Sequence, residues 1–118
     1  MKFPPWRRLR SKFDFAAIYD HRQKAGDRWM LVFARRNGLG YTRIGLSVSR
    51  KHGNSVVRHR LRRLLKEAYR LEQHSIPEGL DMILIPGHQA LGATLSDFRD
   101  SLVRLSRKLT NRLPHRQL

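Results

Sequence analysis

Positive charge is concentrated between Ser47 and Glu67, a stretch in which Glu67 is the one acidic residue. Its cations are Arg50, Lys51, Arg58, Arg60, Arg62, Arg63 and Lys66. Guanidinium groups can hold phosphate oxygens through two parallel hydrogen bonds, so a row of arginines suits a phosphodiester backbone. The local field predicts a polyanionic partner, and nucleic acid is the first candidate.

The whole chain shares this bias. Its 25 lysines and arginines outnumber 9 aspartates and glutamates, and the formal charge of +16 is far more than solubility requires. At 118 residues the chain has the length of a single domain with one core. It lacks cysteine, which excludes disulfides and cysteine-based zinc sites and favours an intracellular, cytoplasmic location.

Neither export nor membrane insertion is predicted. The basic residues 1–10 are not followed by the apolar stretch of about 7–15 residues that a secretory signal requires. The longest apolar run, residues 29–34, is far shorter than the roughly 20 residues that cross a bilayer. Charge alone would allow binding to a membrane surface, but the cationic segment has no bulky aromatic face beyond Tyr69. We therefore expect no membrane partner.

The residues show no catalytic constellation of their own. The histidines are scattered, no His-Glu-x-x-His pattern occurs, and the acids do not cluster as a two-metal centre needs. Helix caps and surface charges account for Asp14, Asp20 and Asp27. We expect neither a catalytic residue nor a metal bound by the protein alone.

A short helix is predicted to begin at Ser11, whose hydroxyl and the acid three residues later match a capping box. Its apolar stripe consists of Phe15, Ile18 and Tyr19. Gly26 lies just beyond its expected end. Residues 27–36 then predict a strand with apolar side chains on both faces. Such a strand is either covered on both sides or presents an exposed aromatic platform, and the residues alone leave both open.

The run Asn37-Gly38-Leu39-Gly40 tolerates positive φ and predicts a hairpin between residues 27–36 and a second strand over residues 43–49. The second strand alternates apolar and polar residues. We expect its polar face, with Arg43 and Ser47, to be open to a ligand.

Residues 55–70 predict a long amphipathic helix. At about 100° per residue, one side carries Leu61, Leu64, Leu65, Ala68 and Leu71. The other side carries His59, Arg62, Arg63, Lys66 and Arg70, with Arg58 and Arg60 at the boundary. The helix is therefore expected to bury one face and to offer a cationic strip on the other.

The rest of the chain predicts a strand and a helix. Residues 80–86 predict a buried strand that ends at a proline. Together with the strand over residues 43–49 and the helix over residues 55–70, this strand suggests a parallel β-α-β unit. Thr94 opens the last helix with a second capping box. Its apolar side consists of Leu95, Phe98, Leu102, Leu105 and Leu109. We expect one RNA-binding domain over residues 1–118, with a basic arm at 1–10 and a loose tail at 112–118.

The order of residues from Leu46 to Glu67 resembles the signature of the bacterial ribonuclease P protein component. The glycine, the apolar pair and the spaced arginines occur together in Leu46-Ser47-Val48-Ser49-Arg50-Lys51-x-Gly53-Asn54-Ser55-Val56-Val57-Arg58-x-Arg60-x-x-Arg63-Leu64-x-x-Glu67. One position departs from the family pattern. Where the family usually has Arg-Asn-Arg, this chain has Arg58-His59-Arg60, so an imidazole replaces an amide.

The resemblance implies an α/β (α+β) two-layer sandwich with a small mixed sheet of about four strands, in the order α-β-β-(β)-α-β-α. It also implies a left-handed β-α-β crossover, whereas handedness statistics alone favour the right-handed form.

The same resemblance implies the protein subunit of ribonuclease P. This subunit binds the catalytic RNA and the 5′ leader of precursor tRNA, assists endonucleolytic removal of the leader, and broadens the substrate range. The RNA carries out the phosphodiester hydrolysis with Mg²⁺ that the RNA mainly holds. The chain would then belong to an enzyme without being its catalyst, and no obligate protein partner is implied.

Two groups of contact residues follow from the resemblance. The residues expected to bind the ribozyme RNA are Arg50, Lys51, Gly53, Asn54, Arg58, His59, Arg60, Arg62, Arg63 and Lys66. The residues expected to bind the leader are Phe15, Tyr19, Arg28, Phe33, Arg43 and Ser47. Aromatic rings stack on unpaired bases at roughly 1–3 kcal/mol each, which suits a leader of variable sequence.

Composition leaves other RNA-binding classes open. A structural RNA-binding protein of the ribosomal type would have the same charge and size. A general RNA chaperone would carry longer disordered basic segments than residues 1–10. The ordered motif favours the ribonuclease P protein over both.

Overall fold

The computed structural model describes residues 8, 9 and 11–113 of the chain. The helices and strands are, in order, α1 (Lys12–His21), β1 (Lys24–Gly26), β2 (Met30–Arg36), β3 (Arg43–Leu46), α2 (Ser55–Glu72), β4 (Leu80–Pro86) and α3 (Leu95–Arg112). The short 3-10 turns are η2 (Arg50–His52), η3 (Gln73–Ser75) and η4 (Ala90–Gly92). The predicted order of helices and strands is confirmed.

The strands form one mixed sheet in the order β1-β2-β4-β3. β2 pairs with β4 in antiparallel fashion, with Met30 opposite Pro86. β3 pairs with β4 in parallel, with Arg43 opposite Asp81. The predicted parallel β3-α2-β4 unit is therefore confirmed, and the left-handed sense implied by the resemblance stays a prediction.

The predicted hairpin between residues 27–36 and 43–49 is wrong, because β4 lies between β2 and β3. The turn at Gly38 has a positive φ of 72°, but it joins strands that are not neighbours. Asn37 closes this turn, since its Oδ1 accepts from the N–H of Leu39 at 2.7 Å. The hairpin of this sheet joins β1 to β2 instead, with Ala25 opposite Val32. A glycine-rich turn predicts that the chain reverses, not which strands pair.

Both predicted strands are also shorter in the structure. Residues 27–29 form the turn before β2, where Asp27 Oδ1 accepts from the N–H groups of Trp29 and Met30 at 2.8 and 3.0 Å. β3 ends at Leu46, although the N–H of Ser47 still donates to the carbonyl of Leu84 at 3.0 Å.

The ends of α1 differ from the prediction in detail. The Ser11 hydroxyl accepts from the N–H of Phe13 at 3.1 Å, whereas the Asp14 carboxylate lies 3.6 Å from Arg35 instead of completing a capping box. The helix ends at His21, and its C-cap is Arg22, with a left-handed φ of 59°, instead of the predicted Gly26.

Parts of the predicted arm and tail belong to the described fold. Within the predicted arm, Arg8 forms a parallel bridge with Ile44, and the N–H of the buried Leu9 donates to the Ile44 carbonyl at 2.7 Å. At the other end, α3 begins with the predicted box at Thr94 and continues to Arg112, and the next residue is buried. The rest of the predicted arm and tail, residues 1–7, 10 and 114–118, lies outside the described residues.

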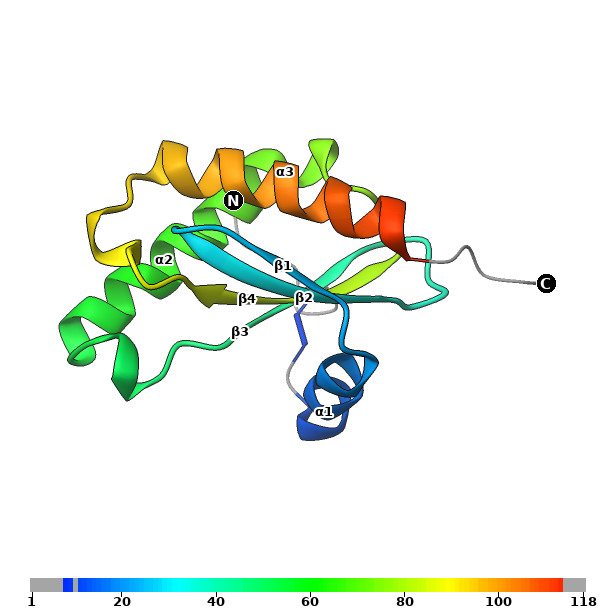
Figure 1. The fold of residues 1–118 in the computed structure, drawn as a ribbon, viewed down its shortest axis with the longest axis horizontal. Coiled ribbons are helices and arrows are strands. Elements are labelled where there is room, and N and C mark those ends of the chain that lie inside the picture. Colours follow the sequence, from blue (N-terminus) through cyan, green and yellow to red (C-terminus); the bar gives the residue numbers. More distant parts are fainter. Residues whose placement is uncertain (1–7, 10, 114–118) are drawn as a thin grey trace.

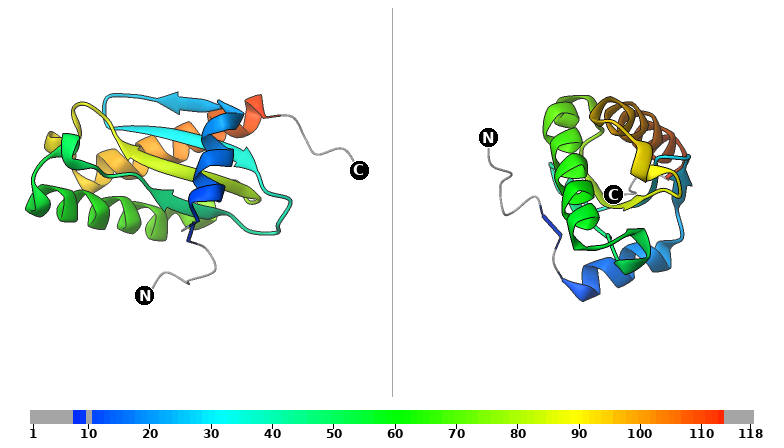
Figure 2. Two further views of the ribbon diagram at one scale, coloured as in Figure 1. Left: turned by 90° about the horizontal axis from the view of Figure 1, so that it is seen from below. Right: turned by 90° about the vertical axis from the view of Figure 1, so that its left-hand side faces the viewer.

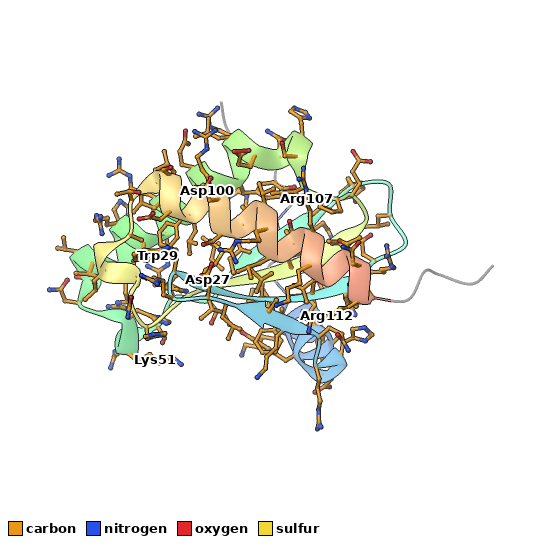
Figure 3. All side chains as sticks on the ribbon, turned by 45° about the horizontal axis from the view of Figure 1, so that its top comes forward. Asp27, Trp29, Lys51, Asp100, Arg107 and Arg112 are labelled. Carbon is orange, nitrogen blue, oxygen red and sulfur yellow. The ribbon has the colours of Figure 1, made fainter. Side chains whose placement is uncertain are left out.

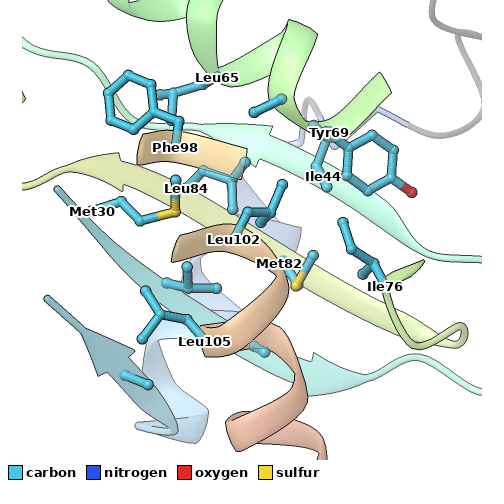
Figure 4. Packing of buried hydrophobic residues seen from close by; sticks show 14 of the residues in the cluster. Met30, Ile44, Leu65, Tyr69, Ile76, Met82, Leu84, Phe98, Leu102 and Leu105 are labelled. Atoms are coloured by element: carbon cyan, nitrogen blue, oxygen red, sulfur yellow. The ribbon is translucent and has the colours of Figure 1, made fainter. Parts of the chain in front are cut away.

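Helices α2 and α3 lie side by side on one face of the sheet, and α1 crosses the other face (Figure 1). The end-on view in Figure 2 shows the sheet between them. The larger core fills the space beneath α2 and α3 (Figure 4), and it includes Met30, Val32, Ala34, Leu65, Tyr69, Phe98, Leu102 and Leu105. The smaller core under α1 consists of Leu9, Ile18 and Ile83, with Phe15, Tyr19, Phe33 and Ile85 partly buried against it. β2 is therefore fully covered on one face and partly covered on the other.

The buried face of α2 is rotated from its predicted position. Tyr69 is 1% exposed and belongs to the core, whereas Leu71 is 38% exposed. The core row runs through Leu61, Leu65 and Tyr69, each one turn after the last. The long aromatic side chain fills space toward β3, and its hydroxyl lies 3.5 Å from the Thr42 carbonyl.

Candidate nucleic-acid interface

A tight turn positions the start of α2. Asn54 caps the helix, because its Oδ1 accepts from the N–H of Val57 at 3.0 Å. Gly53 has a φ of 141°, and a Cβ at this position would lie 2.7 Å from Val57 Cγ1. Conformation and space therefore both require glycine here. The predicted role of Gly53 and Asn54 in shaping this turn agrees with that geometry.

His52 holds the η2 turn in place before this cap. Its Nδ1 accepts a hydrogen bond from the N–H of Ser49 at 2.9 Å. Burial lowers the pKa of His52, and the neighbouring Lys51 charge lowers it further. Both effects favour the neutral imidazole, the form in which Nδ1 can accept this hydrogen bond.

The first half of α2 carries the cations predicted to bind the ribozyme RNA. We call this set the α2 strip, which consists of Arg58, His59, Arg60, Arg62, Arg63 and Lys66. His59, Arg63 and Lys66 are exposed. Arg60 reaches toward η4 and donates to the Ala93 carbonyl at 3.3 Å, and Arg62 reaches toward β3 and donates to the Val48 carbonyl at 3.1 Å. In residues 8, 9 and 11–113, no carboxylate forms a salt bridge with the α2 strip.

The arginines of α3 are engaged differently, whereas Lys108 of the same helix is exposed. Arg99 and Arg104 form salt bridges with Glu72 at 3.1 Å and Asp27 at 2.6 Å. Arg107 donates to the Ser75 carbonyl at 3.2 Å, and Arg112 donates to a carbonyl in β1. Figure 3 shows Asp27 beneath α3, and Lys51 apart on the η2 turn. The positive charge left for a partner is therefore concentrated on α2 and η2, where Arg50 and Lys51 are also exposed.

The rings predicted to bind the leader meet on the α1 face of the sheet. We call Phe15, Tyr19 and Phe33 the aromatic surface. Tyr19 and Phe33 meet edge to face, with ring centroids 4.9 Å apart and planes at 78°. The three rings are half-buried, so they pack on the smaller core and still present an edge or face to solvent. Lys24 Nζ lies 5.7 Å from the Phe33 centroid, which adds a cation beside the rings.

Phe15 lies directly over Gly45 of β3. A Cβ on Gly45 would come within 2.4 Å of Phe15 Cζ, so the missing side chain lets α1 approach the sheet. The sequence placed Gly45 on the polar face of a strand but did not show this contact. A glycine inside a strand is a signal of close approach by another segment.

The other predicted leader residues are spread along the sheet. Arg43 lies opposite Asp81 at the start of β4, and its Nε and Nη2 donate to the Asp81 carboxylate. Arg28 is exposed at the far end, where its carbonyl accepts from the N–H of Gln89. Ser47 is half-buried just after β3. The structure thus gathers the three rings and separates Arg28 from Arg43.

Asp81 is a buried acid to which the sequence assigned no functional role. Its Oδ1 accepts from Asn37 at 2.9 Å, and its Oδ2 lies 3.2 Å from Arg35 Nη2. Burial alone would raise the pKa of Asp81, but hydrogen bonds from Arg43 and Asn37 hold it below its ordinary value. The signal in the sequence was a lone acid at the head of an apolar strand, which must be paired when buried.

Residues 8, 9 and 11–113 contain no group of three or more histidine, aspartate or glutamate side chains placed to hold a metal ion. No helix among them is long and apolar enough to cross a membrane.

A family model described as Ribonuclease P matches residues 3–110. This chain belongs to the ribonuclease P protein family. The ribonuclease P protein component of Clostridioides difficile (strain 630) is 33% identical over 109 residues, which cover 92% of this chain and 96% of that protein. That of Alkaliphilus oremlandii (strain OhILAs) is 31% identical over 102 residues, covering 86% and 90%.

Solved structures agree with this assignment. The ribonuclease P protein of Thermotoga maritima superposes with a TM-score of 0.78 at 30% identity, covering 86% of this chain and 96% of that one. The Staphylococcus aureus protein gives a TM-score of 0.75 at 27% identity, covering 86% and 94%. The resemblance and the α+β fold predicted from the sequence are confirmed.

Proposed function

We propose that this bacterial ribonuclease P protein binds the catalytic RNA of its enzyme through the α2 strip and the η2 turn, and the 5′ leader of precursor tRNA through the aromatic surface. In this role it assists removal of the leader in the cytoplasm and broadens the range of precursors that the enzyme accepts. Phosphodiester hydrolysis belongs to the RNA, with Mg²⁺ that the RNA mainly holds.

The observation that carries this proposal is the uneven pairing of the cations. The α2 strip has no carboxylate partner in the described part of the chain, whereas Arg99 and Arg104 on α3 form salt bridges with Glu72 and Asp27. A concentrated positive surface without internal counter-charges repels itself, and phosphates relieve that repulsion. Arginine is suited to this task because its planar fork can hold two phosphate oxygens at once.

The aromatic surface supports binding of an unpaired strand. A base can stack on a half-exposed ring whatever its identity, so such a surface tolerates leaders of different sequence. Lys24 beside Phe33 supplies a charge for the backbone of the same strand. A double helix would not fit this use, because its bases are already stacked on each other.

Reconstitution tests the proposal. The protein is added to ribonuclease P RNA and precursor tRNA at a low Mg²⁺ concentration that does not support cleavage by the RNA alone. We expect leader removal to be restored by the protein, and the protein without RNA to leave the precursor intact. Failure to restore cleavage, together with tight association with ribosomes, would favour a structural RNA-binding protein of the ribosomal type.

A matched pair of variants locates the RNA contact. Arg63→Gln removes an exposed cation of the α2 strip, and Arg107→Gln removes an exposed cation of α3. We expect the first to weaken binding to ribonuclease P RNA and the second to leave it nearly unchanged. Equal effects would show that the RNA responds to total charge and not to α2.

A further inference from the structure

The connection from β3 to α2, residues 47–54, includes the η2 turn and leads directly into the α2 strip. A backbone hydrogen bond fixes the end of this turn, where the N–H of Gly53 donates to the Arg50 carbonyl at 3.2 Å. A side chain closes its start. The N–H of Ser49 donates to Nδ1 of His52 at 2.9 Å, and the N–H of His52 donates back to the Ser49 carbonyl, also at 2.9 Å. His52 therefore holds the first residue of the turn from both directions.

The start of α3 uses a similar arrangement with a different acceptor. Asp97 Oδ2 accepts from the N–H of Thr94, three residues earlier, at 2.9 Å. A carboxyl group keeps an acceptor oxygen in either protonation state, whereas an imidazole Nδ1 accepts only while it carries no proton. Of these two helix starts, only the one closed by His52 therefore depends on the absence of a proton.

The surroundings of the His52 ring offer nothing to compensate a positive charge. The ring lines a cavity of about 110 Å³ between η2, α2, the end of β4 and η4. α2 and β4 contribute the apolar Leu61 and Pro86, and η4 contributes no charged group. The other titratable groups of the lining are Lys51 on η2 and His88 after β4, and among the described residues the lining holds no acid. An imidazolium here would lose water and gain no counter-charge.

Protonation would therefore reverse the contact between Ser49 and His52. Nδ1 would become a donor that faces a second donor, the N–H of Ser49. This conflict and the uncompensated charge both favour an open turn. Arg50 and Lys51 are exposed on this turn, so its closure decides where these two cations lie relative to the α2 strip.

We propose that His52 is a positioning residue for RNA, because its neutral imidazole holds the η2 turn closed and thereby aligns Arg50 and Lys51 with the α2 strip. Protonation releases the turn, and RNA affinity decreases in acid. A histidine that contacts a phosphate directly would give the opposite sign, since its charged form is the one that binds. This inference rests on the proposed RNA-binding function and adds its regulation by pH.

The pH window follows from the cavity. Burial lowers the pKa of His52 from its ordinary 6.5, and the charge of Lys51 lowers it further. The neutral ring and the closed turn are therefore fully present above pH 6.5. They are lost as the pH falls below 6.5 and through the lowered pKa of the folded state.

Binding of the full chain to ribonuclease P RNA from pH 7.5 to 5.0 tests the proposal. The unsubstituted protein is compared with His52→Asn, which offers a neutral acceptor that does not titrate, and each affinity is divided by its own value at pH 7.5. Changes in the RNA itself cancel between the two proteins. We expect the unsubstituted protein to lose about fivefold more affinity in acid than the variant, the effect of one hydrogen bond. Identical profiles, or a gain in acid by the unsubstituted protein, would overturn the proposal.

Two further variants assign the effect to this ring. His52→Leu removes the acceptor at every pH, so we expect weaker binding at pH 7.5 and no additional loss in acid relative to His52→Asn. His88→Asn removes the other histidine of the cavity and should keep the acid loss. Loss of the acid effect in His88→Asn would assign the titration to His88 and overturn the proposal.

NMR of the protein without RNA separates this inference from the proposed function. We expect the amide signal of Ser49 to shift with the same midpoint as the His52 ring, while that of Thr94 does not follow this midpoint. A Ser49 amide that stays in place while the ring titrates would overturn the role of His52 and leave RNA binding at pH 7.5 standing. If the unsubstituted protein does not bind the RNA at pH 7.5, the proposed function fails, and this inference fails with it.

Discussion

Arg43 and Asp81 are joined by two hydrogen bonds, 2.8 and 2.7 Å long, across the parallel strands β3 and β4. The Asp81 side chain is 0% exposed, while that of Arg43 is 24% exposed. The pair joins β3 to β4 near the first residues of both strands, and so links the two ends of the β3-α2-β4 unit. Arg43, which is predicted to bind the leader, thus also stabilises the sheet.

Replacing Asp81 with asparagine tests how much this pair contributes to the stability of the fold. Arg43 and Arg35 would then face a neutral amide, and we expect the free energy of unfolding to fall by about 2–4 kcal/mol. This lies near the low end of the range for broken buried pairs, because both arginines keep part of their surface in water. Denaturant titration measures the loss. Asp20→Asn, on the exposed side of α1, should change stability by less than about 0.5 kcal/mol, and an equal effect would contradict the assignment.

Acid should weaken the fold through the same carboxylate. The pKa of Asp81 is lowered from 3.8, so its charged form stabilises the folded state above that pH. The contribution is lost as the pH falls below 3.8 and through the lowered pKa of the folded state. Asp27 acts with the same sign: burial raises its pKa, but hydrogen bonds led by the one from Ser101 lower it overall. Circular dichroism should show a shallower acid transition for Asp81→Asn, and an unchanged transition would exclude Asp81 as its source.

The turn before α2 should tolerate no side chain at Gly53. Gly53→Ala places a Cβ 2.7 Å from Val57 Cγ1 in a backbone conformation with a φ of 141°, and we expect a loss of about 1–3 kcal/mol. Gly40→Ala is the matched control, because no atom lies within 4 Å of its added Cβ. It should be neutral within about 0.5 kcal/mol. Equal stability of the two variants would show that the turn can rearrange.

Leader recognition should depend on Phe15. Phe15→Ala is expected to weaken binding of leader-bearing precursor by about 1–3 kcal/mol and to leave binding of leader-free tRNA unchanged. Phe13→Ala is the matched control on the same helix, since Phe13 is 87% exposed and lies outside the aromatic surface. Fluorescence titration with both RNAs measures the difference. Equal losses on the two RNAs would contradict a leader role.

RNA affinity should depend steeply on salt. If six or more cations of α2 and η2 meet phosphates, affinity should fall on the order of 10³-fold or more between 50 and 200 mM salt. Arg63→Gln should lower the slope by about one, and Arg107→Gln should not change it. Filter binding over a salt series measures both slopes. A nearly flat dependence in the unsubstituted protein would contradict phosphate contacts by α2.

Periodicity predicted the helices because their buried faces repeat along the sequence. Leucine spacing predicted α2 and α3, with a capping box at Thr94 for α3. It did not predict the rotation of α2 toward Tyr69, since an aromatic ring reaches farther than the leucines around it. Strand pairing could not be predicted from the Gly38 turn. The missed signal was in residues 80–86, whose apolar run on both faces is typical of a central strand.

The cations of the site could be predicted, but not their partners. Spacing on α2 predicted Arg58, Arg62 and Lys66 on its cationic side, while only the fold shows that Arg62 donates to the Val48 carbonyl. In the sequence, Arg43 also looked like a cation available to RNA. Its partner is the buried Asp81, 38 residues later on β4. Charge is local in a sequence, whereas pairing depends on which segments the fold brings together.

The central place of β4 has a consequence for the order of folding. β1 and β2 can form their hairpin as soon as residue 36 has been synthesised, because they are neighbours in the chain. Among the described residues, β3 contacts an earlier backbone segment through the isolated bridge between Arg8 and Ile44, and its neighbouring strand in the sheet forms only when residues 80–86 emerge. The closing contacts are therefore long in sequence, which slows folding relative to a meander of the same length. Until β4 is synthesised, α2, the most cationic helix, has no completed sheet on which to pack.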